Sequence, residues 1–369
     1  MKILGLPLVV QQQVFVHLNN QEIVLLSFCS AKMKKKIEDM RLKLSFLELE
    51  YTTKRKAILV TGDPPVSDKL FVWCIDPAVV SREVRRSPKR FSFKNGSDTH
   101  YCSIYEDNSG FLSCKIDLQN ASRMVEYLKG LFRIAPLKLN IDPEIIPNLK
   151  RLLSDPVYQQ LETFQLSGLY ITWTKLTSIF NSIPIQNRVV VTTERIHGEV
   201  DKRCKVFEAK TMFFRDAHWL TREHFLSFDS IEKAMFMNVE LTTDDFIAFV
   251  KHWRDSGNTK LVAFAFYMDK VARRTKWNLN AIVAEMGAQP WDRAQRRRFA
   301  KFDKELMCHR EEAEGRIANW AQSDYFDASI GLDFERSDGL LASIDGNTIS
   351  FIFNTWHDRF PQYPGNWSE

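Results

Sequence analysis

Two histidines and one cysteine–histidine pair are the side chains whose types could support acid–base or nucleophilic chemistry. His218 and His224 are six positions apart, so they do not share a helix face as metal ligands at i and i+4 do. Cys308 and His309 are adjacent in sequence, which does not by itself bring a thiol and an imidazole into a catalytic arrangement. Ordinary surface or core positions explain these residues more simply.

The neighbouring carboxylates Asp244 and Asp245 also have a structural explanation. They follow Thr243, the predicted cap of a helix, and acidic side chains are favoured in the positive first turn of a helix. The chain has no motif of a phosphate-binding loop, a dinucleotide-binding turn, a serine-hydrolase elbow or a zinc protease. We therefore expect a protein that is not an enzyme and has no cofactor or metal.

The cysteines indicate a reducing compartment. No two of them have the close spacing of a metal site, and they are too sparse for a disulfide scaffold: Cys29, Cys74, Cys102, Cys114, Cys204 and Cys308. The apolar stretch at residues 3–10 contains Pro7 and lacks the basic start of a signal peptide. No window approaches the roughly 18 to 20 apolar residues of a membrane span. We expect a cytoplasmic or nuclear protein that does not bind membranes.

Length and charge set wide bounds. The 369 residues are enough for about two or three domains. The net charge of +5 comes from 51 basic and 46 acidic residues, which is a small excess for this length and does not by itself indicate nucleic-acid binding.

Apolar spacing near the N-terminus predicts three short helices. Leu6-Pro7 suits a helix start, and an apolar stripe follows at i, i+4 and i+8: Val10, Val14 and Leu18. Asn20 is the predicted cap of a second helix, and a basic third segment covers residues 32–41. Three such helices cannot bury this much apolar surface among themselves, so part of it should meet a partner or the following domain.

The segment LPLVVQQQVFVHLNNQEIVLLSFCSAKMKKKI resembles the F-box. The Leu-Pro start, two apolar pairs, a leucine, a short break and an aliphatic run ending near Cys-Ser are in register, and a start this near Met1 is typical of nematode F-box families. The resemblance implies that a Skp-type adaptor of a cullin–RING ubiquitin ligase binds these residues: Leu6, Pro7, Val10, Val14, Phe15, Leu18, Ile23 and Leu26. The pattern alone leaves open a helical cap on the following domain.

The spacing of apolar residues after the first helices changes once along the chain. Residues 44–117 predict a small antiparallel β region, because apolar–polar alternation is interrupted by Gly, Pro and Asn turn signals. From residue 118, helical stretches alternate with strands predicted near residues 137, 162, 189, 206, 232 and 261. Most steps are 25 to 29 residues, which resembles a leucine-rich-repeat-like array without its strict consensus; a compact α/β domain is the alternative.

Residues 225–266 resemble the F-box-associated type 2 domain of nematode F-box proteins. The matching positions suit helix caps, core and a turn, so the resemblance supplies no catalytic residue: Leu226, residues 231–237, Leu241, Thr242, Asp245, Phe246, Phe249, His252, Trp253, Gly257, Asn258 and Leu261. After residue 330, alternating apolar residues around Asp338-Gly339 and Asp345-Gly346 predict β-hairpins.

A charged helical insertion is predicted near residues 277–320. Arginines and lysines cluster at 293–304, and glutamates follow at 311–314. The run is either a basic helix for an acidic partner or a solvated helix with internal ion pairs. With Trp277, Trp291 and Phe299 nearby, it also supports nucleic-acid binding as an alternative function.

The sequence therefore predicts an α/β protein, α+β overall, in three parts. These are a three-helix F-box at 1–43, antiparallel strands at 44–117, and a repeat-like F-box-associated domain at 118–369 that ends in a β-hairpin region. The leading hypothesis is a non-catalytic substrate-recognition subunit of an SCF-type E3 ubiquitin ligase. It would bind a Skp-type adaptor, through that adaptor a cullin and a RING protein, and an unknown protein substrate. The alternatives are a protein-interaction scaffold outside the ligase and the nucleic-acid-binding protein.

Overall fold

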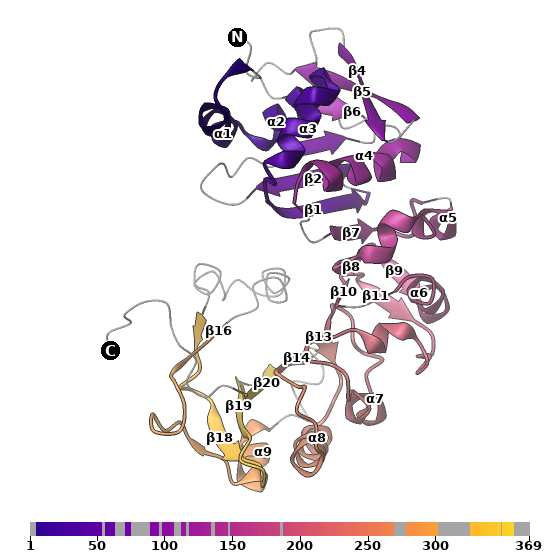
Figure 1. The fold of residues 1–369 in the computed structure, drawn as a ribbon. Helices are drawn as coiled ribbons and strands as arrows, with labels where there is room; N and C mark the ends of the chain where they lie inside the picture. The colour runs from indigo at the N-terminus through magenta and orange to yellow at the C-terminus, as the bar shows by residue number, and fades with distance from the viewer. Residues whose placement is uncertain are drawn as a thin grey trace. The chain divides into compact units, whose positions relative to one another are not determined.

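The computed structural model divides the chain into two compact units (Figure 1). The N-terminal unit is Met1–Gly168 with Ser182–Pro184, and the C-terminal unit is Leu169–Asn181 with Ile185–Glu369. The structure describes these residues: 5–53, 56–62, 71–74, 89–95, 98–106, 112–115, 118–133, 137–146, 148–184, 187–268, 278–301, 325–347 and 349–357. The predicted boundaries at residues 43 and 117 both fall inside the N-terminal unit and stay predictions.

The N-terminal unit begins with three helices and continues into one mixed sheet. The helices are α1 (Leu8–Val16), α2 (Asn20–Cys29) and α3 (Ala31–Asp39). The sheet has the order β8-β7-β1-β2-β3-β6-β5-β4. Its strands are β1 (Leu44–Tyr51), β2 (Lys56–Gly62), β3 (Phe71–Cys74), β4 (Lys89–Asn95), β5 (Asp98–Glu106), β6 (Leu112–Lys115), β7 (Leu137–Ile141) and β8 (Thr163–Leu166).

The predicted antiparallel strands are part of this mixed sheet and do not form a sheet of their own. β1 pairs antiparallel with β2, and its other edge pairs in parallel with β7, where Leu47 lies opposite Leu137. Both edges of β1 are therefore paired, and its side chains Leu47 and Leu49 are buried. Alternation within residues 44–51 revealed the strand but not its second, distant partner.

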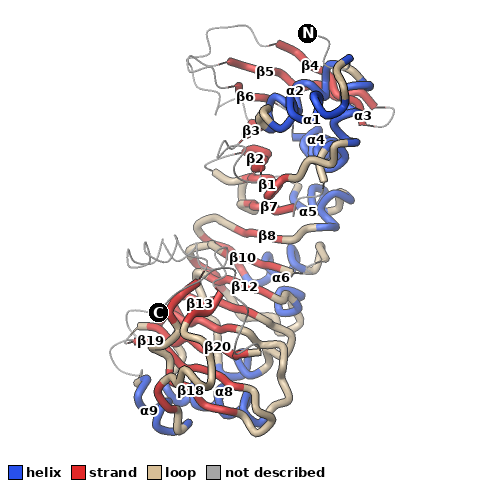
Figure 2. Tube along the Cα trace, turned by 60° about the vertical axis from the view of Figure 1, so that its left-hand side comes forward, coloured by secondary structure: helices blue, strands red, loops and turns tan. Residues whose placement is uncertain are grey.

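Helix α4 (Leu118–Leu131) covers one face of this sheet. The predicted apolar face is confirmed, because these four residues are buried: Met124, Tyr127, Leu128 and Leu131. Figure 2 shows α4 and α5 (Leu149–Leu153) along one side of β1, β7 and β8. The short helix η3 (Pro156–Gln160) leads from α5 into β8.

The C-terminal unit contains a second mixed set of strands in the order β15-β18-β19-β20-β14-β13-β12-β10. The strands β10, β12, β13 and β14 are parallel, and the remaining strands continue the sheet by antiparallel pairing. The bounds are β10 (Arg188–Val191), β12 (Thr211–Phe214), β13 (Lys233–Val239), β14 (Ala263–Met268), β15 (Gln289–Pro290), β18 (Leu332–Glu335), β19 (Leu341–Asn347) and β20 (Ser350–Trp356). The predicted C-terminal hairpins are confirmed by β18, β19 and β20, and Gly339 has the positive φ of 86° that their first turn requires.

The parallel strands are buried on both faces. Phe214, Phe236 and Phe266 form one stacked aromatic row. Their sequence neighbours point to the opposite face, where Phe213, Met235 and Tyr267 belong to a second buried cluster. Continuous apolar runs are what a parallel sheet covered on both faces requires.

Three helices lie along one side of the parallel strands (Figure 1): α6 (Trp173–Phe180), α7 (Arg222–Leu226) and α8 (Thr243–Asp255). The predicted apolar set of α8 is confirmed as buried: Phe246, Phe249, Val250 and Trp253. Its cap is Thr242 and not Thr243, because the extended backbone of Thr242 lets its side chain exchange hydrogen bonds with Asp245 in a capping box. A short parallel pair, β9 (Tyr170–Thr172) with β11 (Arg195–His197), lies outside the main sheet.

One predicted strand was wrong. The segment VFEAK near residue 206 forms the 3-10 helix η4 (Lys205–Glu208), and the strand follows at Thr211–Phe214. Phe207 packs beside Trp173 and Phe228, so the alternation in this segment reflects packing of a helical turn. The true strand is a short, fully buried run without alternation, which gave no periodic signal.

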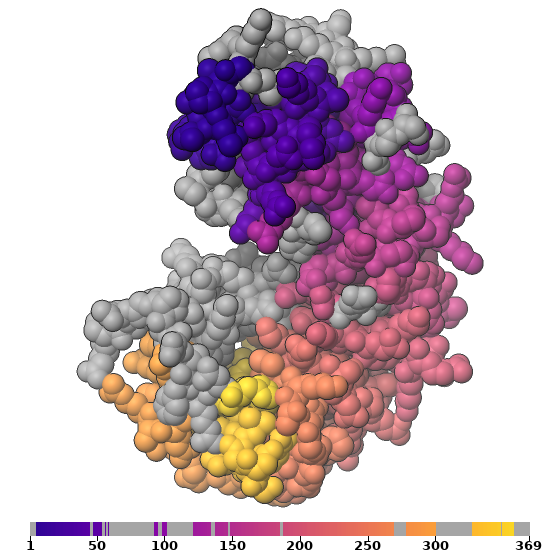
Figure 3. Space-filling model, in the orientation of Figure 1, coloured from indigo at the N-terminus to yellow at the C-terminus, as the bar shows by residue number. Residues whose placement is uncertain are grey.

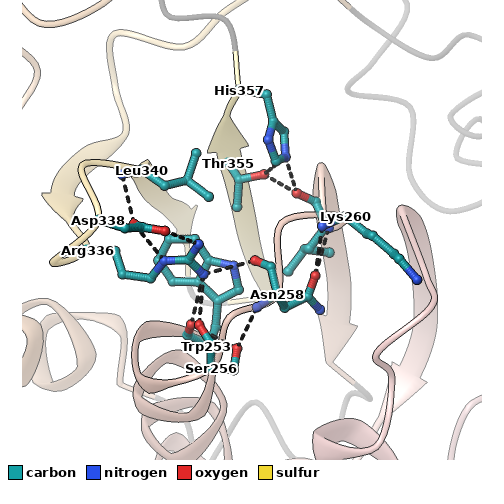
Figure 4. A network of polar contacts seen from close by, with 10 residues as sticks. Trp253, Ser256, Asn258, Lys260, Arg336, Asp338, Leu340, Thr355 and His357 are labelled. Carbon is teal, nitrogen blue, oxygen red and sulfur yellow. Dashed lines mark hydrogen bonds and ion pairs between the residues drawn. The ribbon is translucent and has the colours of Figure 1, made fainter.

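Arg336 closes the C-terminal end of α8 (Figure 4). Its Nη1 donates to the carbonyl oxygens of Ser256 at 3.1 Å and Asn258 at 2.9 Å, and more weakly to that of Trp253 at 3.4 Å. Its other nitrogens donate to the Asp338 carboxylate at 2.9 and 2.6 Å. The hydrogen bonds from Arg336, followed by the Leu340 N–H, lower the pKa of Asp338 to about 2. A buried guanidinium thus satisfies the free carbonyl groups of a helix end and ties α8 to the β18–β19 turn.

The arginine run at 293–298 does not lie on a helix. The helix in this region is α9 (Leu279–Met286), which ends at Gly287 with a φ of 63°. Turns follow, and then β16 (Phe299–Lys301) pairs antiparallel with β17 (Tyr325–Asp327). Trp277, Cys308, His309 and the predicted acidic stretch lie outside the described residues.

No helix in the part of the chain that the structure describes is long and apolar enough to cross a membrane.

Candidate functional site

The first helix has an unusual distribution of polar and apolar residues. It begins after Pro7, whose carbonyl accepts the Gln11 N–H at 3.0 Å. Its buried residues are Gln11 and Phe15, one turn apart. Gln11 is tolerated inside because its Nε2 donates to the Leu6 carbonyl at 2.6 Å. The buried face is therefore shifted from the predicted stripe, of which Val10 is exposed and Val14 and Leu18 are half-buried.

The outward face of α1 is largely apolar, with Gln12 and Gln13 as its exposed polar residues. Four of its nine residues are large aliphatic side chains that stay exposed: Leu8 (54%), Val9 (67%), Val10 (43%) and Val16 (50%). In Figure 3 the indigo residues of this first segment lie at the surface of the N-terminal unit. Clustered apolar surface of this kind is typical of interaction sites, because its contact with water is unfavourable.

Helix α2 is fixed by a capping box at its start and by buried side chains. Asn19, and not the predicted Asn20, is its cap: the Asn19 side chain accepts the Glu22 N–H at 2.9 Å, and the Glu22 carboxylate accepts the Asn19 N–H at 2.8 Å. The extended backbone of Asn19 makes this exchange possible. The α2 side chains Ile23 and Val24 are buried.

Contacts with α4 and β4 fix α2 and α3 on the sheet. Ser27 Oγ and Tyr127 OH are hydrogen bonded at 2.8 Å. The Phe28 ring lies 5.4 Å from that of Tyr127 and 6.0 Å from that of Phe93. On α3, Lys34 Nζ lies 4.5 Å above the Tyr127 ring. Helices α2 and α3 therefore share one core with α4 and β4.

The structure brings the predicted adaptor-binding residues together in the first two helices but at different depths. Pro7 and Val10 are exposed, while four others are half-buried: Leu6, Val14, Leu18 and Leu26. Phe15 and Ile23 are buried in the core of the helical module. Adaptor contact at all eight positions stays a prediction, and the two buried residues can support the surface only from within.

Sequence reasoning missed Leu8, Val9 and Val16 as surface residues. Their signal was present, because the nine residues of α1 are apolar on every side of the helix except at the glutamines. A helix that is apolar all round must be covered on all sides, and the described N-terminal unit covers only one of them.

Comparison with known proteins agrees with this geometry. The F-box domain model matches residues 3–45, so the chain carries an F-box domain at its N-terminus. Two relatives from Caenorhabditis elegans, described as uncharacterized protein F59B2.9 and uncharacterized protein F59B2.8, are 22% and 23% identical to this chain. The alignments cover 98% and 97% of this chain and 80% and 78% of those relatives. No solved structure matches. Residues 225–266, which resemble the F-box-associated type 2 domain, lie outside the matched segment.

The candidate catalytic residues have structural partners. His218 Nδ1 is hydrogen bonded to Asp216, and His224 Nδ1 lies 2.8 Å from Thr221 Oγ1 at a helix start. Asp245 belongs to the capping box of α8 and also accepts a hydrogen bond from Arg222 at 2.6 Å. Within the described residues, no group of His, Cys, Asp or Glu is arranged to hold a metal ion.

Asp216, which follows β12, binds the backbone of β11. Its Oδ2 accepts the Ile196 N–H at 2.6 Å, while its Oδ1 contacts His218. Asn238, at the matching register position near the end of β13, donates to the Arg215 carbonyl at 2.9 Å. These residues link successive strand–turn units, and sequence reasoning identified neither of them.

Burial raises the pKa of Asp216, but the hydrogen bonds from His218 and Ile196 and the charge of Arg195 outweigh burial and hold this pKa below its ordinary value. A carboxyl whose pKa is lowered by folding stabilises the fold above its ordinary pKa, and this contribution is lost as the pH falls through the lowered value. We expect Asp216→Asn to reduce the free energy of unfolding by about 1–2 kcal/mol at neutral pH. In thermal unfolding, the difference from the wild type should shrink over the acidic interval that begins at about pH 4 and extends down through the lowered pKa. A difference that stays constant over that interval would contradict this role.

The basic run at 293–298 is partly internal. Arg296 is fully buried, and its Nε and Nη2 each donate to Asp333 at 2.8 Å. Arg298 forms an ion pair with Asp327 at 2.8 Å, so its charge is balanced within the chain. Reversing Arg296 to test nucleic-acid binding would therefore disrupt the fold, and the run is a poor basis for a nucleic-acid site.

Proposed function

We propose that this chain is a substrate-recognition subunit of an SCF-type cullin–RING E3 ubiquitin ligase. The observation that carries the proposal is the F-box domain with its exposed, apolar first helix. In this role the F-box binds a Skp-type adaptor, and the adaptor brings a cullin and a RING protein. The chain itself is non-catalytic and contributes proximity between a bound substrate and the charged E2.

The C-terminal unit is the proposed substrate-binding part, as a leucine-rich-repeat-like array related to the F-box-associated type 2 domain. The parallel register supports a repeat: Val191 pairs with Phe214 after 23 residues, and Phe214 pairs with Phe236 after 22. In the N-terminal unit, Ile141 pairs with Leu166 after 25 residues. Asp216 and Asn238 support it as well, because each binds backbone of the preceding unit, as a polar ladder in a solenoid does.

Variants on the outward face of α1 test the adaptor interface. We expect Val9→Glu with Val16→Glu to weaken binding to a purified Skp-type adaptor by at least about 100-fold, because each valine loses its apolar burial and each carboxylate must be desolvated. Both side chains are exposed, so the free chain should keep its melting temperature. Co-purification and titration calorimetry measure adaptor binding, and thermal unfolding of the free chain measures its melting temperature.

The matched control is Leu169→Glu with Ile330→Glu. These side chains are 68% and 64% exposed, but they lie in the C-terminal unit. This control should bind the adaptor like the wild type. Equal binding by the α1 variant and the control would overturn the proposed interface. A wild-type chain that binds the adaptor but never captures a cullin would instead favour the scaffold outside the ligase.

A further inference from the structure

Five unpaired cations lie along α3, on the residues that lead from α3 into β1, and at the residue after α4 that bridges to Lys43. We call this group the basic corner and define it as Lys32, Lys36, Arg41, Lys43 and Arg133. Lys36 is half-buried, and the other four are exposed. Among the described residues none of the five has an acidic partner, so their charges are available to a ligand.

Helix α3 sorts its lysines into two groups. Its buried residues, Met33 and Ile37, face the core. Lys34 forms an ion pair with Glu38 at 3.6 Å, and Lys35 forms one with Asp39 at 3.2 Å, so both charges are balanced within the helix. Lys32 and Lys36 are one turn apart and belong to neither pair, so they present two cations on one flank of the helix.

The backbone at Arg41 is held in a conformation that arginine does not prefer. Arg41 has a φ of 50°, and its N–H donates to the Glu38 carbonyl at 3.1 Å where α3 ends. Glycine or asparagine usually occupies this left-handed position after a helix, because a side chain there is strained. A strained, exposed arginine in place of glycine indicates that the side chain is kept for a function other than stability.

Strand pairing brings the remaining two cations together. Lys43 forms a parallel β-bridge with Arg133, and the Arg133 N–H donates to the Leu42 carbonyl at 2.7 Å. Like charges at facing positions repel each other, and no carboxylate among the described residues pairs with either one. A bound anion would relieve this repulsion.

The local charge is high for this protein. Residues 32–43 contain Lys32, Lys34, Lys35, Lys36, Arg41 and Lys43 against Glu38 and Asp39. This excess of four positive charges is most of the net charge of +5 of the whole chain. Concentrated charge of one sign attracts a partner of the opposite sign and accelerates its association.

We propose that the basic corner binds a carboxylate-rich, acidic polypeptide segment of a protein partner. Nucleic acid fits less well, because single strands need aromatic side chains on which bases stack. Among the aromatic side chains of the N-terminal unit whose exposure the structure describes, the one that stays exposed is Tyr101, and it alternates with His100, whose ring contacts Phe93 on the α4 side of the sheet. Tyr101 therefore points to the opposite face. The proposal uses none of the exposed side chains of α1 and does not depend on adaptor binding.

The test is fluorescence anisotropy of a labelled oligoglutamate peptide titrated with the full chain. Binding should weaken with added salt, and Arg41→Glu with Lys43→Glu should weaken it by about tenfold, because two attractions become repulsions. Lys205→Glu with Lys260→Glu is the matched control, since it makes the same change in net charge at exposed lysines of the C-terminal unit. This control should bind the peptide nearly as well as the wild type.

Arg41→Gly separates binding from folding. Glycine accepts the positive φ, so this variant should melt at a higher temperature than the wild type while it binds the peptide more weakly. Absence of wild-type binding, or equal weakening by the control variant, would overturn the proposal. Tighter binding of an oligouridylate of equal charge, sensitive to the same Arg41 and Lys43 variants, would replace the peptide with nucleic acid and also overturn it.

Discussion

Replacing Asp333 with alanine is expected to lower the free energy of unfolding by about 3–5 kcal/mol, because it leaves the Arg296 charge buried without its partner. Asp333 accepts two hydrogen bonds from Arg296 and one from Ser343 Oγ at 2.6 Å. Arg296 Nη2 also donates to the Ala328 carbonyl at 2.9 Å, and its guanidinium lies 4.3 Å from the Trp356 ring centroid. These groups connect the β18–β19–β20 strands to the turn before β16. Urea denaturation followed by tryptophan fluorescence measures the loss.

The informative control for Asp333 removes both charges. Arg296→Met with Asp333→Leu should cost far less than Asp333→Ala alone, because an apolar pair of similar volume has no desolvated charge to satisfy. If Asp333→Ala changed stability by less than about 1 kcal/mol, the buried pair would not exist in solution.

Phe249→Ala is expected to destabilise the protein by about 3–5 kcal/mol through lost burial and the cavity that remains. The Phe249 ring is stacked on Phe225 at 4.1 Å and lies 5.5 Å from Phe264 and 5.3 Å from Phe353. These contacts join α8 to α7 and to two strands of the sheet, so collapse around the missing ring is restricted. Thermal unfolding monitored by circular dichroism should show a clearly lower midpoint.

Ile247→Ala, on the same helix, serves as the comparison for Phe249. Ile247 is only half-buried, so its truncation should cost about 1 kcal/mol or less. Similar losses for the two variants would contradict the aromatic core assigned to α8.

The helical module and α8 could be predicted because local rules act together there. Leu6-Pro7 starts a helix, apolar residues recur at helical spacing, and acidic residues occupy the first turn after Thr242. The strands β7, β13 and β14 also begin within two residues of their predicted positions near 137, 232 and 261. Each lies in a strongly apolar run bounded by turns, which is a signal that sequence alone contains.

The sequence-based predictions were wrong where contacts between residues distant in sequence, or the local backbone, determine the environment of a side chain. Gln11 faces inward on α1 because the Leu6 carbonyl accepts its amide, and no periodicity rule anticipates this. Arg296 belongs to the interior because Asp333, distant in sequence, lies opposite it. The caps at Asn19 and Thr242 were each predicted one residue late. Both residues of the Asn19-Asn20 and Thr242-Thr243 pairs have a side chain that can cap a helix, and only the backbone conformation shows which one does.

The shared core of α2, α3, α4 and β4 makes the F-box a poor candidate for exchange between proteins. Removing the first helices would expose Phe93 and Tyr127 to water and leave Tyr127 OH without Ser27. Transferring these helices to an unrelated domain would expose Phe28 to water, because its ring would lose its contacts with Phe93 and Tyr127. Substitutions on either side of the contact between α2 and the α4–β4 pair should therefore be inherited together. A chimera of this protein should keep residues 5–133 as one piece.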